Sequence, residues 1–298
     1  MGHDKFGSVV HDILRRFGED LSVRDSADAK VISAFLDDCL DQKIRRDQAT
    51  YASRIAYLQL EQARQRLHDF ARWQAQWRER GNKILWVEVS VPHSDPCLID
   101  VDGTNVKISG QIDRIDYCRQ TGELFVFDYK TYDSLKKDSQ KDSSEESLLD
   151  RSEKNEIAYR YWRVLPYPPY KDGTIAPEPL SNGKWRHWTD LQLVLYRPLA
   201  RKILQRENFA HPVNKITSSY IILPKNRLCK AYAADWSRAD LEDARRTFEW
   251  AIQTIRLHWR LGVDPAALID PLNPERGTML DHKVGKIHAD LAPITGIF

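Results

Sequence analysis

The sequence lacks most of the features that would assign it to a familiar class of protein at once. Its four cysteines never form a C-x-x-C pair, which argues against a local zinc ribbon or iron–sulfur motif and predicts scattered free thiols. There is no GxxxxGK[ST], GxGxxG, HExxH or GxSxG motif, so no phosphate loop, dinucleotide site, zinc-protease helix or hydrolase elbow is indicated. No apolar run approaches the roughly 18 residues that cross a bilayer, and the first residues lack the apolar stretch of a secretory signal. We therefore predict a cytoplasmic protein with no membrane partner.

Net charge is also uninformative, because 45 basic and 43 acidic residues leave a formal charge of +2. Charged residues make up 30% of the chain, so any electrostatic field must come from local clusters. The length of 298 residues is compatible with two domains, or with one α/β domain that carries insertions. We predict a single domain over residues 1–262, interrupted by a polar, Ser-rich loop at 133–156 and followed by an extended or partly disordered tail at 263–298.

Hydrophobic periodicity predicts an α/β fold. Apolar residues recur at helical spacing in five segments, namely 6–17, 28–41, 47–79, 189–205 and 237–260. Alternation or continuous apolar character predicts strands at 84–91, 97–101, 106–117, 124–130 and 215–223. The consecutive strands are expected to lie side by side in one sheet, and the proline-rich segment 157–188 is expected to be ordered but irregular.

The chemically informative segments are GQIDRID at 110–116 and FDYKT at 127–131. Side chains two apart in a strand share a face, so Asp128 and Lys130 project together at the end of an apolar face. Asp113 on the preceding strand is placed to stand opposite Asp128. Two such carboxylates repel unless a cation lies between them, and oxygen ligands suit Mg²⁺ or Mn²⁺. Lys130 is then placed to hold a water or to meet charge that develops on a phosphorus centre.

Less specific interpretations of the same residues exist. The acidic and basic side chains of these strands also suit ordinary ion pairs on a solvated sheet face. A run of arginines with two tryptophans suits either a phosphate-binding surface or the solvated face of a helix, and we favour the latter. That run comprises Arg64, Arg66, Arg72, Arg78 and Arg80 with Trp73 and Trp77.

Taken together, five short patterns resemble the RecB-type branch of the PD-(D/E)XK nucleases, especially the nuclease domains of AddB-like and RecB-like helicase–nucleases. They are a Gly-x-x-x-His helix, a strand glutamate, a G-x-x-D-R-x-D strand, D-Y-K-T and a Q-x-x-x-Y helix. They occur in the family's order, as Gly7 to His11, Glu88, Gly110 to Asp116, Asp128 to Thr131, and Gln192 to Tyr196. The resemblance implies a restriction-endonuclease-like core, a central mixed β-sheet flanked by helices, with helical additions.

The resemblance also implies roles for individual residues. The metal ligands would be His11, Asp113, Asp128 and the backbone carbonyl of Tyr129. Lys130 would be the catalytic lysine, and Glu88 would support the metal or the water. Gln192 and Tyr196 would lie beside the site and contact DNA or orient the lysine, whereas Asp116 would make a structural contact. The less specific alternatives are a packed His11, a helix-capping Gln192 and a core Tyr196.

The sequence departs from the family in three respects. The chain starts almost at the His-bearing helix, so we expect a piece of a longer protein. The four-cysteine iron–sulfur clasp of many relatives is missing, so no cluster is expected. The segment 133–188 lengthens the gap before Gln192, which weakens that assignment relative to Asp113, Asp128 and Lys130.

The first functional hypothesis is a Mg²⁺- or Mn²⁺-dependent deoxyribonuclease of DNA recombination and repair, expected to act as an exonuclease. Its partners would be DNA and a helicase subunit, or a helicase region missing from this chain. The alternative is a catalytically silent DNA-binding or subunit-docking module with the nuclease fold, and a weaker third option is a nuclease that acts on RNA.

Overall fold

The computed structural model describes most of the chain in six ranges, 3–47, 54–131, 162–165, 185–188, 190–225 and 228–260, together with Gly183. The chain divides into two compact units. The first comprises Met1–Ser90, Gln111–Leu135 and Ile203–Ala233, and the second comprises Val91–Gly110, Lys136–Lys202 and Ala234–Phe298. The single domain over 1–262 stays a prediction. The loop expected at 133–156 and the tail expected at 263–298 lie outside the described residues.

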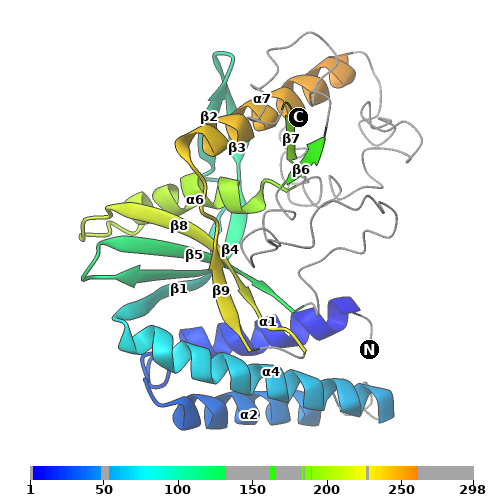
Figure 1. The fold of residues 1–298 in the computed structure, drawn as a ribbon, viewed down its shortest axis with the longest axis vertical. Helices are drawn as coiled ribbons and strands as arrows, with labels where there is room; N and C mark the ends of the chain where they lie inside the picture. Colours follow the sequence, from blue (N-terminus) through cyan, green and yellow to red (C-terminus); the bar gives the residue numbers. More distant parts are fainter. Residues whose placement is uncertain are drawn as a thin grey trace. The chain divides into compact units, whose positions relative to one another are not determined.

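A five-stranded sheet forms the centre of the first unit, in the order β1-β4-β5-β8-β9 (Figure 1). These strands are β1 (Asn82–Val91), β4 (Gly110–Cys118), β5 (Glu123–Lys130), β8 (Lys215–Ile222) and β9 (Lys230–Ala233). β5 pairs antiparallel with β4 but parallel with β8, and β8 pairs antiparallel with β9. The prediction of an α/β fold with a central mixed sheet flanked by helices is therefore confirmed.

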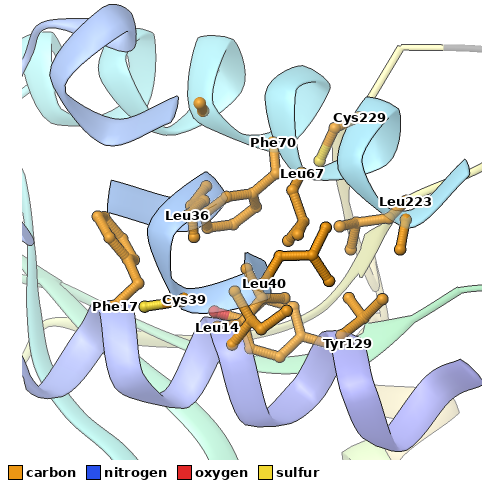
Figure 2. Close-up of a cluster of buried hydrophobic side chains, with 14 of the residues drawn as sticks. Leu14, Phe17, Leu36, Cys39, Leu40, Leu67, Phe70, Tyr129, Leu223 and Cys229 are labelled. Carbon is orange, nitrogen blue, oxygen red and sulfur yellow. The ribbon is translucent and has the colours of Figure 1, made fainter. Parts of the chain in front are cut away.

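Three helices pack against this sheet and enclose the main hydrophobic core. They are α1 (His3–Glu19), α2 (Ala29–Arg46) and α4 (Arg54–Glu79), close to the helices predicted at 6–17, 28–41 and 47–79. Figure 2 shows side chains of this core that come from the helices, from β5 and from the segments beside β8, including Leu14, Leu36, Leu67, Tyr129 and Leu223. Because Tyr129 belongs to this core, helix packing fixes the end of β5 in place.

The strand predicted at 106–117 is wrong as a single element. β3 (Thr104–Ile108) and β4 are separate strands, and Ser109, whose Oγ lies 3.0 Å from His93 Nδ1, interrupts them. β3 pairs with β2 (Cys97–Val101) in a separate two-stranded sheet of the second unit. The expectation that the consecutive strands lie side by side in one sheet is therefore confirmed for β1, β4 and β5 and wrong for β2 and β3. Asp102 and Gly103 join β2 to β3 with positive φ at both residues, as a tight two-residue hairpin requires.

The second unit also holds elements that the sequence predicted and two that it did not. α6 (Gln192–Arg206), which continues into the first unit, and α7 (Arg238–Arg260) match the predicted helices. At the start of α7, Ser237 N–H donates to Asp240 Oδ2 over 2.8 Å and Asp240 N–H donates back to Ser237 Oγ over 3.1 Å, which is a capping box. The expectation of an irregular segment at 157–188 is wrong for β6 (Trp162–Leu165) and β7 (Trp185–Trp188), which pair antiparallel.

None of the described helices has the length and apolar character needed to cross a bilayer. All four cysteines are free, as the scattered spacing predicted.

Gly18 on α1 is required by its contact with β1, since an added Cβ would lie 2.3 Å from Val87 Cγ1. We expect Gly18→Ala to destabilise the protein by about 1–3 kcal/mol in urea denaturation, through overpacking. Gly7→Ala on the same helix is the matched control, because its Cβ would make only an ordinary 3.5 Å contact with Thr131 Oγ1. Equal stabilities of the two variants would show that α1 does not approach β1 this closely.

Candidate active site

The pairing of β4 with β5 brings Asp113 and Asp128 to the same place. The ladder runs from Cys118↔Glu123 to Arg114↔Phe127, and the next residues in this register are Asp113 and Asp128. The ladder gives way there, because the Asp113 carboxylate accepts the Tyr129 N–H over 2.8 Å. Asp113 is thus fixed by the backbone of the strand that carries Asp128 and Lys130.

The two aspartates of the DRID sequence have different partners because they lie on opposite faces of β4. Asp116 shares a face with Arg114, and the two form a fully buried ion pair at 2.5 Å. Asp116 also accepts a hydrogen bond from Trp77 Nε1 over 2.8 Å. Arg114 is therefore held by Asp116 on the buried face, so an ordinary ion pair on a solvated sheet face does not describe these two residues.

Tyr129 connects the core to the site. Its ring packs edge-on against Phe70 of α4, with 6.2 Å between ring centroids, and its hydroxyl accepts a 3.4 Å hydrogen bond from Arg114. Its N–H donates to Asp113, and its carbonyl oxygen lies 3.2 Å from His11 Nε2. The carbonyl position therefore follows from the packing of the side chain in the core.

His11 is supplied by α1, where the flanking residues Val10 and Ile13 are fully buried and anchor the helix. Its ring lies edge-on to Tyr129, and its Nδ1 is 3.6 Å from Asp113 Oδ2. Both ring nitrogens thus face groups of the β4–β5 end.

Glu88 reaches the site through an irregularity in β1. Its φ is +47°, a left-handed conformation that costs a non-glycine residue about 1–3 kcal/mol. Ile84 and Val87 both pack against the helical core, although residues three apart in a regular strand point to opposite faces. Regular alternation would put Ile84, Trp86 and Glu88 on one face of the strand. Trp86 instead packs on Phe209 and is not part of the core cluster that holds Ile84.

His11, Glu88 and Asp113 form a cluster whose donor atoms all lie within 4.8 Å of one another. Carboxylate and carbonyl oxygens suit Mg²⁺ and Mn²⁺, and an imidazole nitrogen favours the transition ion. Neighbouring ligands of an octahedral ion at about 2.1 Å are about 3 Å apart, which the 3.2 Å between His11 Nε2 and the Tyr129 carbonyl matches. The residues present therefore fit a divalent cation.

The electrostatics of the cluster also suit a cation. Burial, followed by the charge of Asp128, raises the pKa of Asp113 well above its usual range. Burial likewise raises the pKa of Glu88, and Asp128 adds to this effect while Arg15 opposes it. A cation between these groups would relieve both the repulsion and the desolvation.

The raised pKa of Asp113 predicts how stability depends on pH without metal. The folded protein holds a proton that the unfolded chain releases, so stability is full below about pH 4 and falls as pH rises toward the raised pKa, by at most about 1.4 kcal/mol per pH unit. Asp113→Asn removes the titrating carboxyl, so its free energy of unfolding should fall less with rising pH than that of wild type. In urea denaturation with EDTA, we expect the variant to exceed wild type in stability by more at about pH 8 than at about pH 5. A gain that does not change with pH would contradict the assignment.

Lys130 and Asp128 form an ion pair beside the cluster. The Lys130 ammonium lies 5.3 Å from the centre of the Tyr220 ring, and only 14% of its side chain is exposed. Asp128 is nearly buried, at 3% exposure. The structure thus places Glu88 in the three-residue cluster, where Asp128 was the predicted ligand. Asp128 lies close enough to raise the pKa values of Asp113 and Glu88, and it holds Lys130 in an ion pair.

Gln192 and Tyr196 belong to the second unit. Gln192 Nε2 donates to Tyr196 Oη over 3.0 Å, and Asp190 Oδ1 accepts the Gln192 N–H over 2.8 Å. α6 begins at Gln192, so Gln192 lies at the first position of the helix and not at the third position of a capping box. Their role beside the site stays a prediction.

The arginine and tryptophan run at 64–80 does not form a stacking surface for bases, and the solvated helix face that we favoured is wrong for Arg66, Trp73 and Trp77. Trp73 and Trp77 stack on each other, with centroids 5.4 Å apart, and pack on Phe127. Arg66 is buried and donates to the backbone carbonyls of Thr131 and Leu223. Three more arginines pair with acidic residues, namely Arg64 with Asp37, Arg72 with Asp69 and Arg78 with Asp25.

A cleft opens at the cluster, lined by Gly7, Ser8, His11, Asp12, Arg15, Glu88 and Gln111. Ser8, Asp12, Arg15 and Gln111 were not candidates from sequence. The spacing of two of them would have indicated that they lie beside His11: Ser8 precedes it by three residues and Arg15 follows it by four, and residues so spaced are neighbours on a helix.

Carboxylates and a lysine at the ends of two adjacent strands, with a histidine supplied by a flanking helix, are an arrangement typical of metal-dependent hydrolases. Consistent with this class, residues 1–148 of the 298 match the model of the PD-(D/E)XK nuclease superfamily. This match indicates nuclease activity and covers α1, Glu88, Asp113 and the Asp128–Lys130 segment. A search of curated proteins found no match to the chain.

Proposed function

We propose that this chain is a Mg²⁺- or Mn²⁺-dependent deoxyribonuclease that hydrolyses phosphodiester bonds, as an exonuclease of DNA recombination and repair. The observation that carries the proposal is the His11–Glu88–Asp113 cluster beside the Asp128–Lys130 pair. A structural module has no need of carboxylates crowded in this way, because their burial without a cation is costly. The resemblance to RecB-like and AddB-like nuclease domains supports a role beside a helicase in the cytoplasm.

Each residue has a task in this proposal. His11, Glu88, Asp113 and the Tyr129 carbonyl would hold the cation, which when bound supplies a Lewis acid for the scissile phosphate. Asp128 keeps Lys130 in place through their ion pair. Lys130 would donate a hydrogen bond to the attacking water or to the phosphate oxygen on which charge develops. Gln192 and Tyr196 would contact the DNA backbone, so cutting would depend little on base sequence.

The test is the cleavage of end-labelled linear DNA, single- and double-stranded, by the purified protein with Mg²⁺, Mn²⁺ or EDTA. We expect metal-dependent release of short products from linear DNA, no cutting of closed circles, and activity at lower concentrations of Mn²⁺ than of Mg²⁺. Cutting of circles would overturn the exonuclease assignment, and preferential cutting of an RNA substrate would favour the RNA nuclease.

Lys130→Met tests whether the protein is an active nuclease or a catalytically silent DNA-binding module. Methionine keeps much of the length of the side chain but removes the ammonium, so cleavage should fall about 10²–10³-fold while DNA binding in a mobility-shift assay persists. If wild type binds DNA but cuts nothing under any metal condition, the catalytically silent module is the better description.

A further inference from the structure

Gln111 contacts Glu88 twice. Its Nε2 donates to Glu88 Oε2 over 2.6 Å and to the Glu88 carbonyl oxygen over 3.2 Å. Gln111 is exposed on β4, lines the cleft, and lies beside the neighbouring strand β1. One amide group therefore holds both the carboxylate and the backbone of the same residue.

Glu88 is the member of the cluster that most needs such support. Its backbone is in the left-handed region, which persists only where the surroundings enforce it. A glutamate side chain also loses up to about 2 kcal/mol of rotamer entropy when it is fixed in one position. The bond to the carbonyl steadies the irregular backbone, and the bond to Oε2 selects one side-chain position.

We propose that Gln111 is a positioning residue that orients the Glu88 carboxylate toward His11 and Asp113 for metal binding. The inference rests on the proposed function, since it assigns a role in the same site. An amide suits this task because it donates without carrying charge. A lysine or arginine would compete with the cation for the carboxylate, and an acidic residue would repel it. Partners that orient a ligand typically contribute 10–100-fold to metal affinity or activity.

The test is a calorimetric or EPR titration of Mn²⁺ into the purified protein and its variants. Gln111→Leu should weaken Mn²⁺ binding by about 10-fold but shift the urea midpoint only slightly, because Gln111 is exposed and loses only the two hydrogen bonds to Glu88. Gln65→Leu, which replaces another exposed glutamine on α4, is the matched control and should leave Mn²⁺ affinity unchanged.

A double-mutant cycle tests whether Gln111 acts through Glu88. In a Glu88→Gln background, Gln111→Leu should cause little further loss of Mn²⁺ affinity, whereas a role unrelated to Glu88 would give additive losses. Asp113→Ala in the same titration distinguishes a failure of the proposed metal site from a failure of the role proposed for Gln111. If wild type and Asp113→Ala both fail to bind Mn²⁺, the proposed function is overturned. If wild type binds and Gln111→Leu binds equally well, only the role of Gln111 is overturned.

Discussion

Asp113→Asn is expected to lower the rate of metal-dependent DNA cleavage by about 10²–10³-fold, the effect of removing several kcal/mol of metal-derived stabilisation. The substitution removes the charge that the cation needs, yet an amide oxygen can still accept the Tyr129 N–H, so the fold should be retained. Initial rates with Mn²⁺ on linear DNA measure the effect, with circular dichroism to check folding.

Asp12→Asn is the matched control for Asp113→Asn. Asp12 lines the same cleft but pairs with Arg15 and Lys43 and is not part of the three-residue cluster. Its loss should change the rate only slightly. If Asp113→Asn and Asp12→Asn cut DNA equally well, the cluster is not the catalytic centre.

Arg114→Ala is expected to destabilise the protein by about 3–5 kcal/mol, because it leaves the Asp116 carboxylate buried without its cationic partner. Arg114 also lies over the rings of Trp73 and Phe127, 5.6 Å and 5.7 Å from their centroids, so packing is lost as well. Urea denaturation at neutral pH measures the change.

The double substitution Arg114→Met with Asp116→Leu distinguishes a buried pair from ordinary packing. It removes both charges together and should restore most of the stability that Arg114→Ala loses, because apolar residues of similar size often replace buried ion pairs without loss. A loss below about 1 kcal/mol for Arg114→Ala would mean that the pair is not buried as described.

The positions of Asp113, Asp128 and Lys130 could be predicted, because they depend only on the alternation of side chains along two strands that one short turn connects. The D-Y-K spacing places Asp128 and Lys130 on one face of β5, and the turn between β4 and β5 leaves Asp113 next in register to Asp128. The same alternation separates Asp113 from Asp116, which therefore pairs with Arg114 in the core.

Other parts of the site depend on tertiary structure and leave little local signal. The left-handed backbone at Glu88 is not suggested by a glutamate in an apolar strand, because this conformation usually favours glycine or asparagine. The amide of Gln111 meets Glu88 only through the pairing of strands far apart in sequence. From sequence, the run with Trp73 and Trp77 suits either a phosphate-binding surface or a solvated helix face, and their packing on Phe127 depends on a strand about 50 residues further along the chain.

The central claim is that His11, Glu88, Asp113 and the Tyr129 carbonyl hold a divalent cation. A crystal of the protein grown with Mn²⁺, with diffraction recorded to reveal the anomalous signal of manganese, tests it most directly. We predict one strong peak within about 2.0–2.4 Å of a ring nitrogen of His11 and an oxygen of Asp113, with Glu88 directed at the same ion. A peak elsewhere, or none at the cluster in crystals of protein that cuts DNA with Mn²⁺, would contradict the account.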